Sequence, residues 1–419
     1  MKTELAIFGG RPVIQSGLSP YKSIGLAERI AVNRVIDSGS LSGFYGSWGD
    51  QFLGGNEVRR FEEAWSETFK VPYAVSVNSN TSGLYAALAA IEVSPGDEVI
   101  VPPTTMSATA ISPLLYGAVP VFADIEPDTF CLDINSVNRL LTEKTKAVVA
   151  VNLFGHPAKL RELADLCRSR GIFLIEDNAQ APLASEYGKY TGTIGDIGIF
   201  SLNYHKHIHT GEGGVCTTNN PELALRLQAV RNHSENILEY TKLSPVNMVG
   251  FNFRLTEIAA AIGTEQLRKI ESEVRKREAV GEMLSVKLAD LEGLTVPSVR
   301  SGCRHVFYVW AMRIDEEKLG VNRERFGEAL TAEGFPNFLG YTRPLYLLPT
   351  FQKRIAIGRE GWPFTLSNRT YYKGLCENAE RLYERELLCF EPCAYDLDES
   401  TVKRLIEAVQ KVHYYRNRL

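Results

Sequence analysis

Short apolar runs alternate with helical patterns between residues 73 and 220, and this alternation constrains the fold more than any other feature. Strands are predicted at residues 73–78, 98–101, 119–123, 146–153 and 173–176, with helices at 82–91, 108–117 and 158–170. Strands that alternate with helices predict an α/β domain with a mostly parallel, doubly wound sheet. Ligands of such sheets bind beyond the carboxyl ends of the strands, so the residues after each run are the first candidates for a site.

The pattern changes after residue 220. Helices are predicted at 221–231, 255–287, 323–333, 375–386 and 400–415, and a strand at 306–314. These elements indicate a smaller C-terminal α+β domain, and the most probable division falls in the stretch 292–304. We therefore expect a large domain over residues 1–291, which includes an N-terminal arm and a long linking helix, and a small domain over residues 292–419.

Composition excludes several classes of protein. The 419 residues carry 46 basic and 50 acidic side chains, a net charge of −4, so no basic excess indicates nucleic-acid binding. No apolar stretch approaches the roughly 20 residues of a membrane-spanning helix, and no secretory signal is expected. The seven cysteines contain no CxxC pair, which is typical of free thiols in a reducing compartment. We expect a cytoplasmic protein without nucleic-acid or membrane partners.

An acid and a lysine stand just beyond two of the expected strands. Asp177 directly follows the run 173–176. Lys206 follows a further expected strand, residues 197–201, and precedes a Gly-Glu-Gly-Gly segment at 211–214. Pyridoxal phosphate (PLP) needs a lysine for its Schiff base and a carboxylate that keeps the pyridine nitrogen protonated. It also needs hydroxyls and N–H groups at a helix start for its phosphate, which Asn80, Thr81 and Ser82 offer.

Six motifs in this order resemble the DegT/StrS group of sugar aminotransferases, which have PLP fold type I, the aspartate aminotransferase fold. The motifs are Asn-Ser-Asn-Thr-Ser-Gly-Leu at 78–84, Pro-Gly-Asp-Glu-Val-Ile-Val-Pro at 95–102, Glu-Asp-Asn-Ala-Gln at 176–180, Gly-Asp-Ile-Gly-Ile-Phe-Ser at 195–201, Lys206 with 211–214, and Gly-Phe-Asn-Phe-Arg-Leu-Thr-Glu at 250–257. The resemblance extends from about residue 5 to the end of the chain.

The resemblance implies roles for the matching residues. Lys206 would link to the cofactor and move the substrate proton, Asp177 would pair with the pyridine nitrogen, and Gln180 would lie near the ring hydroxyl. The residues expected to bind the phosphate are Asn80, Thr81, Ser82 and Ser201. The family forms homodimers with shared active sites, so Asn252 would reach the neighbouring subunit's phosphate, with Arg254 beside it.

The sequence departs from the family at two positions of the expected site. Met106 stands where an aromatic residue usually stacks on the pyridine ring, and a thioether can still pack against a ring. Asn80 replaces the usual glycine of the phosphate loop, and asparagine tolerates the same backbone turn better than most residues.

Three histidines alternate around the lysine, at 205, 207 and 209, which raises zinc binding as an alternative. No carboxylate or cysteine at metal-ligand spacing accompanies them, so no metal is expected. Some relatives replace the lysine with histidine and act as PLP-dependent keto-sugar dehydratases. Lys206, however, lies five residues after Ser201 and five before Gly211, which is the family's spacing for the lysine. A non-catalytic sensor is a further alternative. The presence of both Lys206 and Asp177 argues against it, because a protein that only binds a ligand has no need of that pair.

The expected reaction moves an amine from glutamate or glutamine to a ketone or aldehyde of a sugar or cyclitol, as in amino-sugar biosynthesis. Members that use nucleotide-linked sugars tend to carry two histidines where this chain has Tyr341 and Tyr346. Trp48, in the long glycine-rich loop 38–55, is expected to fold over the cleft, and Arg343 to meet an anionic group. These differences favour an inosose-like or sugar-acid substrate, with a nucleotide-linked sugar as the alternative.

Overall fold

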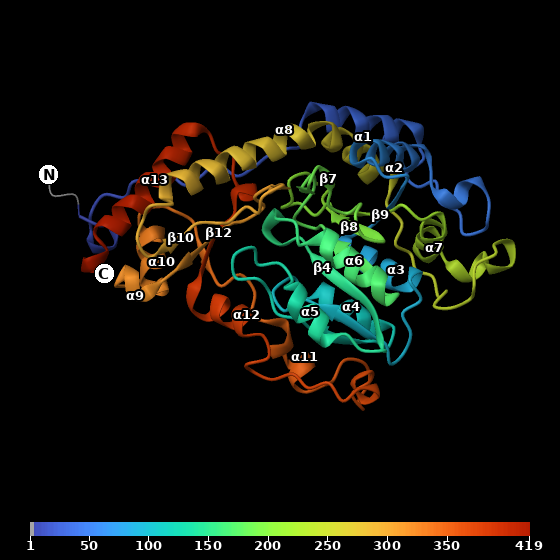
Figure 1. Cartoon of the computed structure of the whole chain (residues 1–419). Helices are drawn as coiled ribbons and strands as arrows, with labels where there is room; N and C mark the ends of the chain where they lie inside the picture. The colour runs from blue at the N-terminus through green and yellow to red at the C-terminus, as the bar shows by residue number, and fades with distance from the viewer. Residues whose placement is uncertain (1–3) are drawn as a thin grey trace.

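The computed structural model describes residues 4–419, which form two lobes joined by the long helix α8 (Glu257–Leu288) (Figure 1). The large lobe holds a seven-stranded sheet of order β1-β9-β8-β5-β4-β2-β3. Its strands are β1 (Tyr73–Val77), β2 (Glu98–Val101), β3 (Val119–Phe122), β4 (Thr145–Val151), β5 (Phe173–Asp177), β8 (Ile197–Ser201) and β9 (Gly214–Thr218).

Five neighbouring strands of this sheet, β3, β2, β4, β5 and β8, run parallel, and β9 runs antiparallel to both β8 and β1. Helices cover both faces, and the strands are therefore apolar along nearly their whole length. The covering helices are α3 (Asn80–Ala90), α4 (Ala108–Leu115), α5 (Ile134–Leu140), α6 (Leu160–Arg170) and α7 (Pro221–Arg231). This is the mostly parallel, doubly wound sheet that the sequence predicts.

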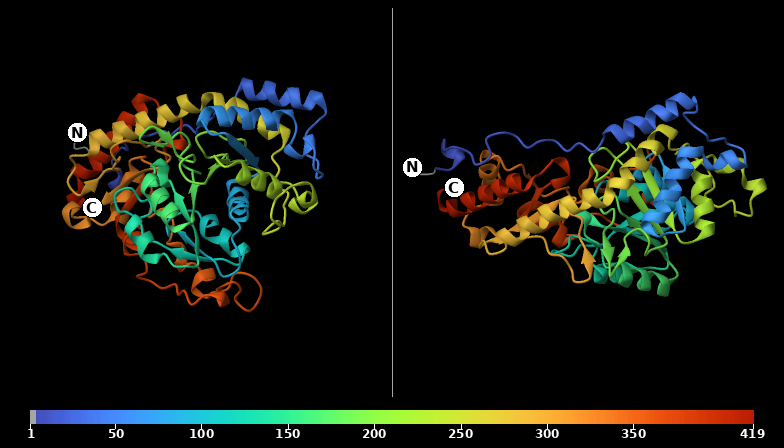
Figure 2. Two further views of the ribbon diagram at one scale, coloured as in Figure 1. Left: turned by 45° about the vertical axis from the view of Figure 1, so that its right-hand side comes forward. Right: turned by 90° about the horizontal axis from the view of Figure 1, so that it is seen from above.

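The small lobe is an antiparallel sheet of order β10-β12-β14-β13 that packs against helices. The strands are β10 (Leu294–Thr295), β12 (Trp310–Ile314), β13 (Phe338–Leu339) and β14 (Leu387–Phe390), and the helices are α9 (Glu316–Leu319), α10 (Arg323–Ala332) and α13 (Glu399–Tyr414). Leu5, Ile14 and the C-terminal part of α8 belong to the same core. The described N-terminal segment and the C-terminus therefore lie at the same end of the molecule (Figure 2).

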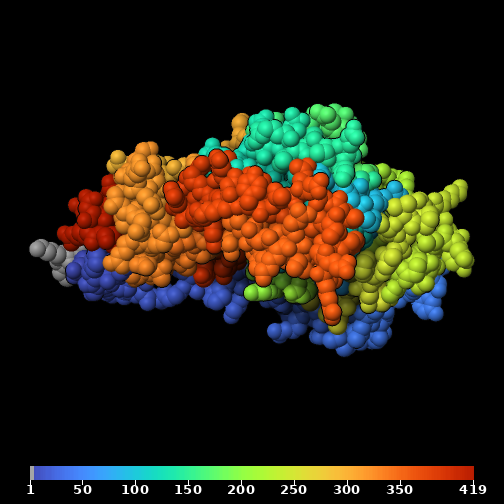
Figure 3. Space-filling model, turned by 90° about the horizontal axis from the view of Figure 1, so that it is seen from below, coloured from blue at the N-terminus to red at the C-terminus, as the bar shows by residue number. Residues whose placement is uncertain are grey.

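Residues 345–379, called the strap below, leave the small lobe and pack on the large sheet. The Phe122 ring of β3 contacts Tyr346, Phe351 and Tyr371, and the Tyr371 hydroxyl donates to the Pro120 carbonyl at 2.8 Å. Figure 3 shows this orange segment lying across the lower face of the molecule. The strap contains α11 (Pro349–Gln352) and the start of α12 (Glu377–Arg381).

The expected division at residue 292 does not follow this packing. The strap, expected in the small domain, shares the core of the large sheet, whereas residues Leu5 and Ile14, expected in the large domain, share the small core. The reason is the row of aromatic side chains in the strap, which are buried against β3, the edge strand of the large sheet.

Other differences from the sequence expectation concern local structure. The sequence analysis did not predict helices α1 (Leu26–Ser38) and α2 (Asn56–Phe69). It also did not predict a small sheet of order β11-β6-β7, with strands at Cys303–Arg304, Ser185–Glu186 and Lys189–Tyr190. The strand expected at 306–314 begins only at Trp310, because the N–H groups of Val306 and Val309 donate to Gly155 and Phe154. Within residues 4–419 we find no helix with the length and apolar character needed to span a bilayer.

Candidate active site

A cavity of about 220 Å³ opens beyond the carboxyl ends of β5 and β8, where the topology of the sheet predicts a ligand site. Eight of the residues proposed from the sequence lie on its wall: Asn80, Thr81, Met106, Asp177, Gln180, Ser201, Lys206 and Tyr341. Polar and aromatic residues that the sequence analysis did not assign also line it: Ser79, Thr105, Thr109, Asn203, His205, Glu212 and Tyr308.

Asp177 ends β5 as a buried carboxylate, with 4 % of its surface exposed. It accepts hydrogen bonds from the Thr109 hydroxyl at 3.0 Å, the Ala179 N–H at 3.1 Å and the Asn80 amide at 3.4 Å. Burial raises the pKa of Asp177, and these donors and Lys206 oppose the rise. A desolvated carboxylate of this kind is stabilised by a cationic partner such as a protonated ring nitrogen.

Lys206 lies in the turn after β8 with 8 % of its surface exposed, and its Nζ atom lies 4.2 Å from the ring centroid of Tyr308. Burial lowers the pKa of Lys206 to about 8, against opposing effects of Asp177, Glu391 and Cys393. At pH 7 about a tenth of such amines are neutral, against about one in three thousand for an ordinary lysine. The neutral amine is the form that attacks a carbonyl carbon.

The start of α3 forms one end of the cavity. Ser79 caps the helix, since its hydroxyl accepts the N–H of Ser82 at 3.0 Å, and Asn80 and Thr81 follow in the first turn. Gly214 of β9 permits this close approach, because a Cβ atom there would lie 2.8 Å from the nitrogen of Asn80. A helix start beside the Ser201 hydroxyl attracts an anion.

Ser82 does not line this end of the cavity, contrary to the expectation. Its hydroxyl donates to the Asn78 side chain at 2.6 Å and lies 2.9 Å from the Ser79 hydroxyl. The helix begins two residues earlier than the apolar pattern indicates, so Ser79 takes the capping position and turns Ser82 inward. Ser79 is the residue that sequence reasoning missed, and its place before the Asn80-Thr81 pair was the available signal.

Gln180 and Tyr341 connect the two lobes across the cavity. The Gln180 amide donates to the Tyr341 hydroxyl at 2.6 Å and accepts the N–H of Phe154 at 2.7 Å. Burial raises the pKa of Tyr341, so its hydroxyl stays protonated at neutral pH. Met106 is 61 % exposed at the mouth, and its sulfur lies 3.2 Å from the Ala108 nitrogen.

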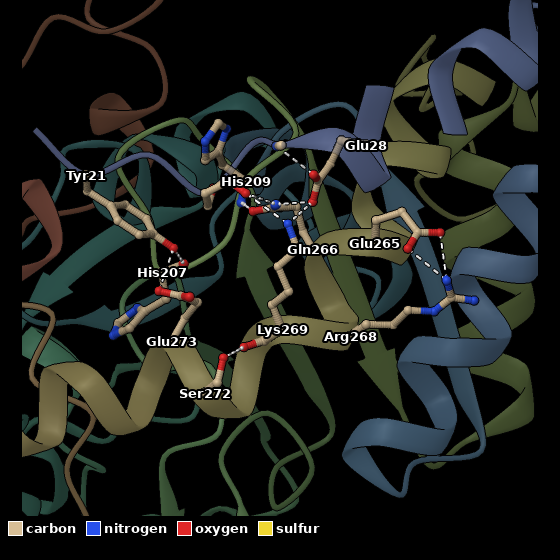
Figure 4. A network of polar contacts seen from close by, with 12 residues as sticks. Tyr21, Glu28, His207, His209, Glu265, Gln266, Arg268, Lys269, Ser272 and Glu273 are labelled. Atoms are coloured by element: carbon tan, nitrogen blue, oxygen red, sulfur yellow. Dashed lines mark hydrogen bonds and ion pairs between the residues drawn. The ribbon is translucent and has the colours of Figure 1, made fainter. Parts of the chain in front are cut away.

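The loop that carries Lys206 is held on its outer side by the N-terminal arm and α8 (Figure 4). The Tyr21 hydroxyl lies 3.0 Å from both the His207 carbonyl and the Glu273 carboxylate. The N–H of His209 donates to Gln266 at 3.4 Å, and Gln266 donates in turn to Glu28 at 2.7 Å. These bonds fix the backbone of the loop just after Lys206 from its outer side.

Three residues expected to meet the substrate lie elsewhere. Tyr346 is fully buried in the strap, where its hydroxyl bonds to Glu380, because the aromatic cluster around Phe122 holds it there. Arg343 is exposed and is not part of the cavity wall. Trp48 packs on Phe52, with ring centroids 5.5 Å apart, rather than over the cleft of its own chain.

The position of Trp48 follows from the burial of Phe52. That side chain is fully buried against Ala229, Ile237 and Met248, which draws the loop toward α7. The Asn232 amide donates to the carbonyls of Tyr45 and Phe52, at 2.9 and 3.1 Å, and ties the loop to the segment that follows α7.

Asn252 and Arg254 lie in the strand-like stretch paired with Asn232 and do not line the cavity of their own chain. The Arg254 guanidinium donates to Asn252 at 2.8 Å and to Asn232 at 3.4 Å. This is the position that the sequence analysis assigned to contacts with a neighbouring subunit.

The histidines around Lys206 do not point to one face. His205 lines the cavity, His207 is buried with its Nε2 atom 2.9 Å from the Val306 carbonyl, and the His209 ring accepts the N–H of Gly211. The turn conformation of the loop replaces the strand alternation that would have brought them together. Among residues 4–419 no cluster of three metal-ligating side chains occurs.

The chemistry of the cavity fits PLP. The cavity offers a buried carboxylate that could hold a proton on a pyridine nitrogen, a lysine of lowered pKa that faces the same space, and a capped helix start whose N–H groups could bind a phosphate. The buried Oδ1 atom of Asn80 has no hydrogen-bond partner among the described residues, which leaves an acceptor free beside Asp177.

Solved structures of PLP-dependent aminotransferases have the same fold as this chain, which is PLP fold type I. Residues 47–410 match the sequence model of the DegT/DnrJ/EryC1/StrS aminotransferase family, and the chain belongs to that family. It is an aminotransferase of the sugar-modifying type, and the family is PLP-dependent.

Individual relatives differ in substrate. The chain is 33% identical to an L-glutamine:2-deoxy-scyllo-inosose aminotransferase of Streptoalloteichus tenebrarius, over 98% of both chains. It is 35% identical to the GDP-perosamine synthase of Caulobacter vibrioides, over 71% of this chain and 79% of the relative. A structure of the E. coli GDP-4-keto-6-deoxy-D-mannose-3-dehydratase with bound hydrated PLP has a TM-score of 0.78, 26% sequence identity and coverage of 94% and 99%.

The buried histidines beside the site predict a loss of stability in acid. Burial lowers the pKa of His156 to about 4 and that of His207 to about 3, whereas both titrate near 6.5 in the unfolded chain. The unfolded chain therefore binds protons that the folded chain does not. The stability that these histidines contribute is full above about pH 6.5 and is lost as the pH falls through about 4 for His156 and about 3 for His207. We expect His207→Gln to reduce this pH dependence, by up to about 1.4 kcal/mol per pH unit.

The measurement is urea unfolding at about pH 7.5 and about pH 5. Ser169→Ala, at an exposed side chain without a titratable group, is the control for the effect of a substitution as such and keeps the wild-type pH dependence. An identical fall in stability for wild type and His207→Gln would contradict the prediction.

Proposed function

We propose that this chain binds PLP and transfers an amine from glutamate or glutamine to the ketone or aldehyde of a sugar or cyclitol. The observation that carries the proposal is that Lys206 and Asp177 face one cavity at the ends of β5 and β8. When bound, PLP supplies an electron sink for the carbon that gains or loses the amine.

The residues of the chain would divide the remaining work. Asp177 holds a proton on the ring nitrogen, Ser201 and the start of α3 bind the phosphate, and the Lys206 amine moves the proton of the reacting carbon. Gln180 and Tyr341 orient the ring from the opposite wall, where they already bond to each other.

The dehydratase alternative depends on a histidine in place of the reacting lysine. Here the side chain of Lys206 reaches the cavity, while the neighbouring His207 is turned away to Val306. This arrangement supports transamination rather than dehydration.

Borohydride is expected to fix PLP covalently on the wild-type protein but not on Lys206→Ala. The same variant should lower turnover by about 10²–10⁴-fold or more, because the proton-transfer group is removed. Asp177→Asn should still bind PLP, yet lose orders of magnitude in turnover. Absorbance, peptide mapping and a glutamate half-reaction measure these effects. Lys189→Ala, at an exposed lysine, is the control. Borohydride labelling of a different lysine would refute the assignment.

The chain is further proposed to act as a homodimer whose sites are shared. Asn252 lies outside its own cavity, and α1 together with the loop before Asn252 exposes apolar side chains: Leu26, Ile30, Ile36 and Val249. Exposed apolar side chains on these two segments support an interface over them. Across such an interface Asn252 would reach the phosphate bound by the neighbouring subunit.

A subunit-mixing experiment tests the shared site. Lys206→Ala and Asn252→Ala chains are each expected to be inactive by themselves. A dimer that contains one chain of each kind should have one active site of its two, because that site combines the intact Lys206 of one chain with the intact Asn252 of the other. Mixing Lys206→Ala with itself after the same treatment is the control. Full activity of a monomer in sedimentation would exclude the proposal.

For the acceptor, the proposal favours an inosose-like polyol or a sugar acid over a nucleotide-linked sugar. Two tyrosines, Tyr308 and Tyr341, line the cavity among many hydroxyl, amide and charged side chains, and an aromatic wall beside such polar partners suits a small polyol. The inosose aminotransferase of Streptoalloteichus tenebrarius matches nearly the whole length of the chain, which supports this preference.

A competition assay on the amine-loaded cofactor form distinguishes these acceptors. Free inososes and oxidised sugar acids are expected to yield amine products detected by mass, with UDP- and dTDP-linked keto-sugars as weaker competitors. Tight binding of the nucleotide-linked sugars, without binding of free cyclitols or sugar acids, would reverse the preference while leaving the transaminase assignment intact.

A further inference from the structure

The N-terminal arm, residues 19–28, contacts the loop of Lys206 from outside the cavity. The Tyr21 hydroxyl lies 3.0 Å from the main-chain carbonyl of His207, the residue directly after the lysine. Burial raises the pKa of Tyr21, so the hydroxyl stays protonated at neutral pH and can donate to this carbonyl. A residue that lies far from the loop in the sequence therefore holds the main chain next to Lys206 (Figure 4).

Tyr21 is itself held by an ion pair on α8. Arg277 and Glu273 lie one helical turn apart, form an ion pair at 2.8 Å and are both buried. The Glu273 carboxylate lies 3.0 Å from the Tyr21 hydroxyl. The Arg277 guanidinium lies 3.9 Å from the centroid of the tyrosine ring, within the range of cation–π attraction. The ring and the hydroxyl of Tyr21 are thus both fixed.

A second contact meets the loop two residues further on. The N–H of His209 donates to the Gln266 side chain of α8 at 3.4 Å. Gln266 donates in turn to Glu28 at 2.7 Å and to the Ser23 carbonyl at 3.2 Å. Glu28 is 1 % exposed and forms an ion pair with Lys269. The arm and α8 therefore act together on this part of the loop.

The arm is also paired with the small lobe. The N–H of Tyr21 donates to the Ala394 carbonyl at 3.0 Å, and the N–H of Asp396 donates to the Ser19 carbonyl at 2.8 Å. These two bonds fix the backbone that carries the Tyr21 ring. The arm thereby connects the small lobe to the loop of the lysine.

The loop has bonds of its own at its two ends. The N–H of Lys206 donates to the Asn203 carbonyl and that of Thr210 to the Leu202 carbonyl, both at 3.0 Å. The His207 ring is held separately, with its Nε2 atom 2.9 Å from the Val306 carbonyl. The contacts of Tyr21 and Gln266 act on the main chain between these ends, so substituting their side chains leaves the other bonds in place.

We propose that Tyr21 and Gln266 are positioning residues for Lys206. They hold the main chain at residues 207 and 209, and so fix the backbone from which the lysine side chain enters the cavity. The inference rests on the proposed function, because it concerns the lysine that would carry the cofactor. It adds that the N-terminal arm, which lies outside the cavity, sets the geometry of that lysine.

The first test measures hydrogen exchange of the full-length chain without PLP, by mass spectrometry of the peptide that covers residues 203–211. Tyr21→Phe keeps the ring beside Arg277 and removes the hydroxyl. The peptide should exchange about fivefold faster, the factor expected for loss of one hydrogen bond of ordinary strength. Gln266→Met, which is nearly isosteric, should also speed its exchange.

The strap offers a matched control. The Tyr371 hydroxyl donates to the Pro120 carbonyl at 2.8 Å, and Tyr371 is not part of the cavity wall. Tyr371→Phe therefore loses the same kind of bond and should leave exchange of the 203–211 peptide unchanged. Unchanged exchange of this peptide in Tyr21→Phe would overturn the inference. Equally faster exchange along the whole chain would overturn it too, because the bond would then support only general stability.

The second test separates kcat from KM in the glutamate half-reaction of the PLP-loaded chain. Tyr21→Phe should lower kcat by about tenfold, because the amine that moves the proton is displaced, and should leave KM for glutamate within about twofold. Tyr371→Phe should change neither value. Wild-type kcat in Tyr21→Phe, despite faster exchange of the loop, would refute a positioning role. Should Tyr21→Phe fail to fold by circular dichroism, Gln266→Met decides by the same two measurements.

Failure of the proposed function is visible separately, as borohydride-fixed PLP on a lysine other than Lys206. Unchanged exchange of the 203–211 peptide in Tyr21→Phe, with PLP fixed on Lys206 in the wild-type chain, would overturn the role of the arm alone.

Discussion

Burial of two opposite charges in one cavity is the constraint on which the rest of the structure depends. Asp177 and Lys206 are both almost inaccessible to solvent. Burial raises the pKa of Asp177 and lowers that of Lys206, so it favours the neutral form of each group. Such groups are stable only when fixed dipoles and partners replace water. The hydrogen bonds of Thr109 and Ala179 to Asp177 and the ring of Tyr308 beneath Lys206 supply that replacement.

The same principle explains the fully buried Glu176, which precedes Asp177 on β5. Its carboxylate accepts the N–H groups of Gly192, Ile194 and Gly195 at 2.6–2.8 Å, and burial raises its pKa. These bonds fix the loop that leads into β8 and so into the turn of Lys206. The two adjacent acids therefore have different roles: Glu176 orders the backbone of the loop, and Asp177 faces the cavity.

Sequence reasoning located the parts of the site that depend on local pattern. Asp177 and Lys206 follow apolar strands, and parallel strands bring such residues to one edge, so both positions could be predicted. Tyr308 could not, because it lies about a hundred residues further along the chain and only the packing of the small lobe brings it to the cavity. Trp48 was misplaced because the burial of Phe52 against α7 outweighs the glycine-rich character of its loop, which carries no signal for its neighbours.

The two tyrosines of the cavity, Tyr308 and Tyr341, are attached both to the small sheet and to the large lobe. Tyr341 lies just before the strap, which is tied to the large lobe by the Leu345 N–H to Pro103 bond at 2.8 Å and by the Arg369–Glu98 ion pair at 2.7 Å. Tyr308 is continuous with the small sheet through β12. Tyr308 is also tied to the large lobe, because the N–H groups of Val306 and Val309 on either side of it donate to the carbonyls of Gly155 and Phe154. Both tyrosines are therefore held against the large lobe by hydrogen bonds, and together they fix the wall of the cavity opposite Asp177.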